Sequence, residues 1–250
     1  MAQTKRIHTL DEIRGFCVFC MVFDHALFTL GYMFGGEFAR NAFDFFTFIS
    51  PAFAATFIMI CGISCYLSHS NLRRGIKILS AALVITVATL TVTPDAPIIF
   101  GILHLLGTSV LIFIPLKKLI DRIHPLFGLV LCAVFFFLTY SVSDGKLGTE
   151  PLTIELPAVL YESGYLMIFG FRKLSSAYSD YFPLLPWIFA FFSGCFLGRF
   201  AREEKFPEFM YKPRVPFFSM LGKSAFLVYI AHQPIAYGVF YLLSSLTDKT

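Results

Sequence analysis

The fold class of this chain is decided by the stretch His124-Pro-Leu-Phe-Gly-Leu-Val-Leu-Cys-Ala-Val-Phe-Phe-Phe-Leu-Thr-Tyr-Ser-Val142. The stretch contains no aspartate, glutamate, lysine or arginine. An α-helix needs about 20 mostly apolar residues to cross the ~30 Å hydrocarbon core of a bilayer. This length and composition are typical of a transmembrane helix.

Six further segments resemble this one in length and composition. They cover about residues 13–35, 48–68, 75–93, 97–116, 181–200 and 218–246. Over the whole chain, 57% of the residues are hydrophobic and only 14% are charged, whereas a soluble domain has about 25% charged residues. We therefore predict an all-α, polytopic integral membrane protein with about seven transmembrane helices. Residues 1–250 are expected to form a single transmembrane domain.

The link between the fifth and sixth spans, residues 143–180, is predicted to be a long loop on the outer side. It contains an apolar stretch, Ala158–Phe171, that is short for a span and is interrupted by Glu162. We expect this stretch to be interfacial or re-entrant. Asp180 is expected to cap the sixth span, with Pro183 in the first turn of that helix.

Lysine and arginine are distributed unequally across the seven spans. Of the 20 such residues, 15 fall on the side of the N-terminus and 5 on the opposite side. Because cytoplasmic loops are enriched in lysine and arginine, the N-terminus is predicted to be cytoplasmic and the C-terminus to lie outside. The net charge of +4 is small, and no nucleic-acid partner is expected. The six cysteines all lie in apolar stretches and are interpreted as buried hydrophobic residues.

Ionisable side chains at membrane depth are costly and usually face a cavity or the interior of the helix bundle. Asp24 and His25 lie ten and eleven residues after Arg14, which is about 15–16 Å along a helix. His104 and His232 are expected at a similar depth in two other spans. Three histidines at one depth predict a shared polar cavity. Hydrogen bonds that merely pack the helices and a metal site are the alternatives, and no metal is predicted.

The positions on the first helix refine this prediction. Arg14 and His25 differ by only ~20° around a helix and share a face, whereas Asp24 and His25 point ~100° apart. Asp24 is therefore expected to find a separate partner, such as another histidine or a hydroxyl group. A second basic group, Arg73-Arg74-x-x-Lys77, could bind a polyanion such as a cofactor phosphate or could only enforce the topology.

A series of motifs runs in order along nearly the whole chain. The series consists of Arg6-Ile-x-x-Leu10-Asp11-x-x-Arg14-Gly15, Asp24-His25, Pro51-Ala-Phe53, Gly62-Ile-Ser64, Phe100-Gly-Ile-Leu-His104, Asp180-Tyr-Phe-Pro-Leu-Leu-Pro-Trp187, Leu221-Gly-Lys-Ser224 and Tyr229-x-x-His232-Gln-Pro234. Together these motifs resemble the bacterial members of the heparan-α-glucosaminide N-acetyltransferase catalytic-domain family, within the transmembrane acyltransferase superfamily.

The resemblance implies transfer of an acetyl group from cytosolic acetyl-CoA, across the bilayer, to an amine or hydroxyl acceptor on the outer side. In the lysosomal members the acceptor is a terminal glucosamine amine. This chain is shorter than those enzymes, so we expect a sugar or another small acceptor rather than heparan sulfate. We expect a multi-pass protein of a bacterial-type plasma membrane. A homodimer is a further expectation, because most oligomers are symmetric dimers.

Acetyl transfer to an amine or hydroxyl requires a base, and neutral histidine suits that role near pH 7. We assign it to His25, with His104 and His232 as the alternatives. Asp24 or Asp180 would orient the imidazole or the acceptor amine. His104 is also a candidate donor to the oxyanion of the tetrahedral intermediate.

The expected cofactor contacts lie mainly at the cytoplasmic end. Arg14 would hold a phosphate of CoA while the pantetheine arm reaches inward, and Arg73, Arg74 and Lys77 are the next candidates. Gln233 is a candidate donor to the thioester oxygen.

Two other classes of function fit a polytopic protein. In a small transporter or channel, the histidines would relay protons or bind the substrate, but inverted repeats of the transporter kind are not visible in the sequence. A seven-helix receptor or scaffold is the other alternative, although a G-protein-coupled receptor has its N-terminus outside.

Overall fold

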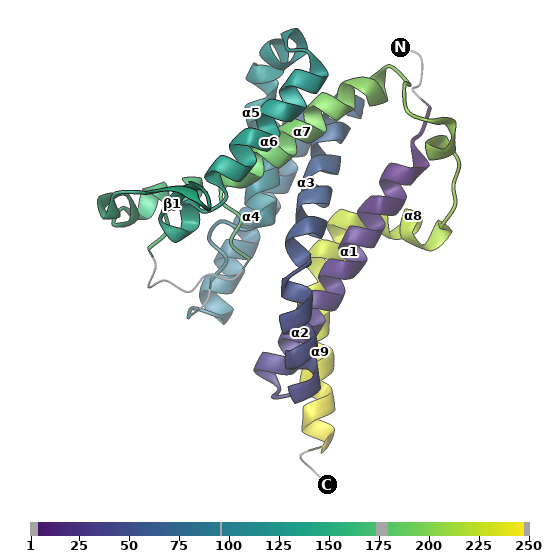
Figure 1. The fold of residues 1–250 in the computed structure, drawn as a ribbon. Coiled ribbons are helices and arrows are strands. Elements are labelled where there is room, and N and C mark those ends of the chain that lie inside the picture. Colours follow the sequence, from purple (N-terminus) through teal and green to yellow (C-terminus); the bar gives the residue numbers. More distant parts are fainter. Residues whose placement is uncertain (1–4, 96, 174–179, 248–250) are drawn as a thin grey trace. The chain divides into compact units, whose positions relative to one another are not determined.

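The computed structural model describes residues 5–95, 97–173 and 180–247 (Figure 1). Within these residues, seven helices are long and apolar enough to cross a membrane. They cover His8–Tyr32, Ser50–Leu67, Asn71–Val92, Ile102–Arg122, Pro125–Asp144, Leu184–Arg202 and Ala225–Leu243. The prediction of an all-α, polytopic membrane protein is confirmed.

Large apolar side chains are exposed on two of these helices, α4 (Asn71–Val92) and α6 (Pro125–Thr139). Val84 and Val87 of α4 and Val130 and Val134 of α6 are each more than half exposed. Monomeric soluble proteins rarely expose large contiguous apolar patches. These helix faces are suited to contact with lipid tails.

The chain folds as two compact units, each described here by itself. Unit 1 contains residues 1–57 and 206–250, and unit 2 contains residues 58–205. The first boundary between them falls within α3 (Ser50–Leu67). The single domain expected over residues 1–250 stays a prediction.

Unit 1 is built around its first helix. Its elements are α1 (His8–Phe28), the π-helix η1 (Thr29–Met33), α2 (Glu37–Thr47), the first part of α3, the 3-10 helix η5 (Glu208–Tyr211), α8 (Pro216–Lys223) and α9 (Ala225–Thr247). Helix α1 packs against both α8 and α9. A Cβ atom on Gly15 would overlap the carbonyl group of Phe218, and one on Gly222 would overlap that of Asp11. Glycine at both positions therefore permits the close approach of α1 and α8.

A carboxylate on α1 accepts hydrogen bonds from the backbone at the start of α8. The Oε1 atom of Glu12 accepts from the backbone N–H groups of Arg214 at 2.6 Å and Val215 at 2.9 Å. Asp11 forms ion pairs with Arg6 at 2.8 Å and Arg14 at 3.1 Å. Both carboxylates near the start of α1 are therefore already paired.

The first and last predicted spans differ from the helices observed. Helix α1 begins at His8 rather than at residue 13, and two charged residues of its first turns, Asp11 and Glu12, are bonded within the unit. The predicted span 218–246 is two helices, α8 and α9, separated at Ser224. Pro216 occupies the first turn of α8, where its missing N–H group is not needed.

Unit 2 contains four further long helices and a compact segment between two of them. Its elements are the rest of α3, α4, α5 (Ile102–Arg122), α6, the 3-10 helix η2 (Val142–Asp144), β1 (Lys146–Thr149), β2 (Leu152–Glu155), the 3-10 helices η3 (Ala158–Tyr161) and η4 (Gly164–Phe169), and α7 (Leu184–Arg202). Helix α5 packs against α4 and α7. Leu105, Phe113 and Phe191 are fully buried in this core. A Cβ atom on Gly62 of α3 would overlap the carbonyl oxygen of Phe191 on α7.

The segment predicted as a long loop, residues 143–180, contains regular structure in its described part. Strands β1 and β2 pair antiparallel, with Lys146 opposite Glu155. The stretch Ala158–Phe171 contains η3 and η4 instead of a spanning helix. The hydroxyl group of Tyr161 donates to the backbone carbonyl of Val142 at 2.5 Å and joins η3 to η2, the short helix that follows α6.

The expectation that Asp180 caps the sixth span is wrong. Helix α7 begins at Leu184, with Pro183 as its N-cap residue. Asp180 instead lies at the start of α5, where its Oδ2 atom accepts from the backbone N–H of Ile102 at 3.4 Å. A carboxylate at that position satisfies one of the free N–H groups of a helix N-terminus.

Candidate active site

Two histidines from different helices of unit 1 form a hydrogen-bonded pair. His25 lies in the last turn of α1, and His232 lies within α9. The Nδ1 atom of His25 is 2.6 Å from the Nε2 atom of His232. The two rings are stacked, with centroids 4.9 Å apart and an interplanar angle of 27°. Two of the three histidines expected to converge are therefore in direct contact.

The surroundings of His232 assign the protons of both rings. Its Nδ1 atom lies 2.5 Å from the backbone carbonyl oxygen of Tyr229, which only accepts, so Nδ1 bears the proton. In a neutral ring, Nε2 of His232 then accepts from the Nδ1–H group of His25. Neutral His25 consequently has its lone pair on Nε2. The hydrogen-bond network thus leaves a basic nitrogen of His25 for a reacting group.

A second set of bonds joins α1, η1 and α9 beside this pair, through Thr29, the first residue of η1. The hydroxyl group of Thr29, which is fully buried, donates to the carbonyl oxygen of His25 at 2.8 Å. It also accepts from the Nε2 atom of Gln233 at 3.1 Å. The Oε1 atom of Gln233 has no hydrogen-bond partner among the described residues. Gln233 therefore retains a carbonyl oxygen and a second N–H for a ligand.

Asp24 is next to His25 in sequence but does not contribute to this pair. Its Oδ1 atom is buried and makes no hydrogen bond to any residue that the structure describes. The separate partner expected for this oxygen is thus not found among those residues. A buried carboxylate oxygen without a partner is costly, which favours its use by a ligand with an N–H or O–H donor.

Arg14, the first candidate for a cofactor phosphate, lies on α1 and is paired with Asp11 through its Nη1 atom. Its side chain is 23% exposed. Asp11 also pairs with Arg6, so two cations share this carboxylate. The cofactor role of Arg14 stays a prediction.

His104 lies in the first turn of α5 in unit 2, where both of its ring nitrogens are bonded. Nδ1 accepts from the backbone N–H of Gly101 at 3.2 Å. The hydroxyl group of Thr86 donates to the carbonyl oxygen of Ile98 at 2.7 Å, so at 3.1 Å it accepts from the Nε2–H of His104. The His104 ring therefore caps α5 and joins it to α4.

Asp180 caps the same end of α5 as His104. These two predicted catalytic residues meet at one helix N-terminus, but both belong to unit 2. Their approach to the His25–His232 pair of unit 1, and their catalytic roles, stay predictions.

The second basic group lies in the first turns of α4 and divides into two kinds of side chain. Arg73 and Lys77 are exposed. Arg74 instead turns inward, where its Nη2 atom lies 3.2 Å from the carbonyl oxygen and 2.9 Å from the Sγ atom of Cys61. All six cysteines are buried and free, as the sequence predicted. Arg73 and Lys77 are therefore better placed than Arg74 to meet an anion.

Some of the residues around the histidine pair were not predicted. Thr29 was missed, although its spacing of four residues from His25 allows a hydroxyl to bond the preceding turn of a helix. The carbonyl of Tyr229 was also missed, since a backbone group leaves no signal in the sequence. Among the described residues, no group of three or more histidine, cysteine, aspartate or glutamate side chains is placed to hold a metal ion.

Comparison with known proteins adds one result. A family model described as "Heparan-alpha-glucosaminide N-acetyltransferase, catalytic" matches residues 6–234. The matched range includes both histidines of the pair, Gln233 and every other predicted site residue. Neither the curated proteins nor the solved structures gave a match.

Proposed function

Because the chain belongs to the heparan-alpha-glucosaminide N-acetyltransferase catalytic family and is thus a transmembrane acetyltransferase, we propose that it uses cytosolic acetyl-CoA as donor. The acceptor is an amine or hydroxyl group, as on a sugar, on the outer side of a plasma membrane. The observation that supports this proposal best is the His25–His232 pair, with its 2.6 Å contact.

His25 is the general base of the proposed reaction. The nitrogen or oxygen atom of the acceptor attacks the carbonyl carbon of the thioester. At the same time, the Nε2 atom of His25 takes the proton from that nitrogen or oxygen. The tetrahedral intermediate then collapses, the C–S bond breaks, and the proton on His25 passes to the departing CoA sulfur. General-base assistance of this kind is worth about 10²–10⁴-fold in rate.

His232 is a positioning residue for that base. When His25 gains a proton at Nε2, its Nδ1–H still donates to Nε2 of His232, and His232 still donates to the carbonyl of Tyr229. The chain of bonds holds the imidazole in one orientation and stabilises the imidazolium through aligned dipoles. In many histidine sites, a hydrogen bond at one ring nitrogen decides whether the other nitrogen bears a proton. His232 has this role for His25.

Two further groups of unit 1 have free polar atoms that suit the substrates. The second amide N–H of Gln233 is a donor for the oxyanion of the tetrahedral intermediate. The Oδ1 atom of Asp24, which no described residue bonds, is an acceptor for an amine or hydroxyl of the incoming substrate. His104 is less suited to donate, because its Nε2–H is bonded to Thr86.

The donor enters from the predicted cytoplasmic end. Arg14 lies on the α1 face that leads to His25, about 16 Å away along the helix. Arg73 and Lys77 are exposed at the start of α4. Arg14 is the proposed contact for a phosphate group of CoA, and Arg73 and Lys77 are the alternatives to it.

The test is acetyl transfer by the purified chain in sealed liposomes. Radiolabelled acetyl-CoA is supplied in one compartment and a panel of amino sugars and neutral sugars in the other. We expect an acetylated sugar in the compartment that lacked acetyl-CoA. The matched variants are His25→Ala, which should be inactive, and His69→Ala, an exposed histidine between α3 and α4, which should be active. Equal product from wild type and His25→Ala, or no product from either, would overturn the proposal.

A further inference from the structure

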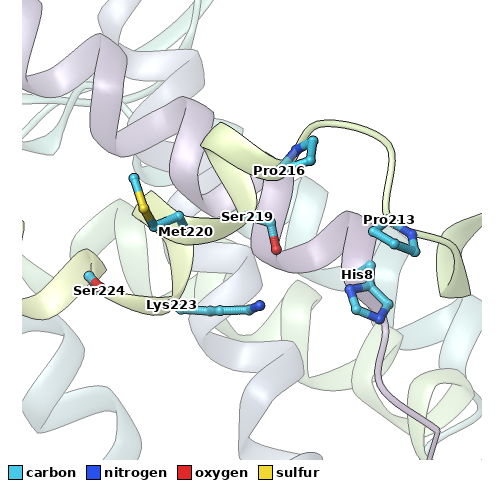
Figure 2. A pocket seen from close by; sticks show the side chains of 7 residues that line it. All are labelled: His8, Pro213, Pro216, Ser219, Met220, Lys223 and Ser224. Atoms are coloured by element: carbon cyan, nitrogen blue, oxygen red, sulfur yellow. The ribbon is translucent and has the colours of Figure 1, made fainter.

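Unit 1 has a cavity of about 420 Å³ that the catalytic proposal does not use (Figure 2). It lies where the start of α1, the segment before α8 and the junction of α8 with α9 come together. His8, the first residue of α1, forms one wall, and Lys223, the last residue of α8, forms another. On the predicted topology this cavity is at the cytoplasmic end of the unit.

Two nitrogen-containing side chains of the cavity, His8 and Lys223, have unused bonding capacity among the described residues. The Nδ1 atom of His8 is buried and makes no hydrogen bond to any described residue. Lys223 forms no ion pair with the residues that the structure describes. In Figure 2 the amino group of Lys223 extends toward His8, and the hydroxyl oxygen of Ser219 points into the space between them. These groups are placed to meet one acceptor from three sides.

The nearby carboxylates do not compete for these donors. Asp11 is occupied by Arg6 and Arg14. Glu12 is occupied by two backbone N–H groups at the start of α8. Neither residue lines the cavity. The cavity therefore presents a positive charge without a counterion, which favours an anion.

The remaining walls are apolar. Pro213, Pro216 and Met220 line the cavity beside the polar groups. Methionine adapts its shape to irregular apolar partners. A ligand that fills this space thus needs an anionic group next to an apolar part, which a small inorganic anion does not have.

We propose that this cavity binds a phosphate-bearing amphiphile, with its phosphate on Lys223 and His8 and its apolar part against Pro213 and Met220. Two molecules available at that end of the protein have this chemistry. One is the phosphorylated adenosine end of CoA, and the other is an anionic phospholipid. Binding of either molecule at this site does not depend on the acetyl-transfer reaction.

The test compares Lys223→Gln with Lys212→Gln. Lys212 is exposed in the segment before α8, but it does not line the cavity. Each protein is held as the full chain in nanodiscs of neutral phosphatidylcholine. Binding of CoA and of dephospho-CoA, which lacks the 3′-phosphate, is measured by calorimetry. In parallel, the thermal midpoint is measured as phosphatidylglycerol replaces part of the neutral lipid.

If the ligand is the nucleotide, wild type should prefer CoA to dephospho-CoA by about tenfold, the scale of a hydrogen bond to a charged group. Lys223→Gln should abolish that preference and Lys212→Gln should keep it. If the ligand is the lipid, phosphatidylglycerol should raise the thermal midpoint of wild type and Lys212→Gln but not of Lys223→Gln. Equal behaviour of the two glutamine variants in both arms would overturn the proposal.

Two more variants separate binding from folding. Lys223→Arg keeps the charge and should restore the response lost in Lys223→Gln, whereas His8→Gln should reduce it. A Lys223→Arg variant that folds but remains without response would count against the proposed phosphate contact. Because the readouts are binding and thermal unfolding with non-acetylated probes, they do not depend on turnover. Failure of the acetyl-transfer proposal would leave them unchanged.

Discussion

The histidine pair of unit 1 and His104 of unit 2 are the same chemical group in two different settings. In unit 2, the backbone of Gly101 and the hydroxyl of Thr86 occupy both ring nitrogens of His104. In unit 1, the bonds run in one direction, from His25 through His232 to a backbone carbonyl. The first arrangement uses all the hydrogen-bonding capacity of the ring, and the second leaves one lone pair at its end.

The difference shows that the depth expected from the sequence does not separate a histidine whose two nitrogens are both bonded from one that keeps a lone pair. Within the membrane, both kinds of histidine need a polar partner because water is absent. What separates them is whether the partners use both nitrogens of the ring. The predictions below test this comparison.

The largest expected effect comes from His25. We expect His25→Ala to lower kcat by about 10²–10⁴-fold, because it removes the proposed base, while the affinity for CoA stays within a few-fold. Single-turnover acetyl transfer and calorimetric CoA binding measure the two quantities. The same assay on His104→Ala, corrected for the folded fraction, should give a rate within a few-fold of wild type. A larger loss from His104→Ala than from His25→Ala would reverse the comparison.

His232 should have a smaller effect than His25. We expect His232→Ala to lower kcat by about 10–100-fold, because His25 loses the group that orients its ring; partners that orient metal-bound histidines have effects of this size. The KM for the acceptor should change little, because His232 does not contact it. His232→Gln, which keeps an acceptor near Nδ1 of His25, should recover part of the rate. If His232→Gln is as slow as His232→Ala, orientation through that hydrogen bond is not the reason for the loss.

For His104 the expected loss is in stability. His104→Ala should lower the free energy of unfolding by about 1–3 kcal/mol, because it leaves the N–H of Gly101 and the hydroxyl of Thr86 without their partner. Thermal unfolding in detergent, with His69→Ala as the exposed control, measures the change. His104→Gln should be less damaging, since an amide has both a donor and an acceptor. An unchanged midpoint for His104→Ala would remove the capping role.

The smallest expected effect is at Thr29. Thr29→Val removes the hydroxyl that joins His25 and Gln233 but keeps the volume, and we expect a loss of about 0.5–1.5 kcal/mol in the free energy of unfolding. Thr29→Ser should retain most of that free energy. Unfolding curves of wild type, Thr29→Val and Thr29→Ser, recorded under the same conditions, measure these differences in the free energy of unfolding. Equal midpoints for Thr29→Val and wild type would contradict the bridging role.

The spans were predictable because apolar composition over about 20 residues decides whether a helix enters lipid. The prediction was less accurate at helix ends. The break at Ser224 directly follows Gly222 and Lys223, but hydropathy averaged over the whole span of residues 218–246 does not mark it. The hairpin β1–β2 was missed because each of its strands has only 4 residues, which is too short a pattern to indicate a strand.

Pairing between chosen residues was predictable only in part. Arg14, His25 and His232 were singled out by charge and depth, and the last two are in contact. Asp180 was assigned to the helix that follows it in sequence, whereas its carboxylate bonds the N-terminus of α5. Local sequence rules place a cap next to its own helix and cannot identify a cap that comes from a distant segment.

The sequence by itself determined that this chain crosses a membrane about seven times, which residues are polar at depth, and which family it resembles. These properties follow from the composition and order of the residues in the linear sequence. Only the tertiary structure decided that His25 meets His232, that both nitrogens of His104 are used, and that Lys223 faces His8 across a cavity. The reason is physical: a hydrogen bond depends on distances of about 3 Å and on direction, and these are set by how helices pack rather than by position in the sequence.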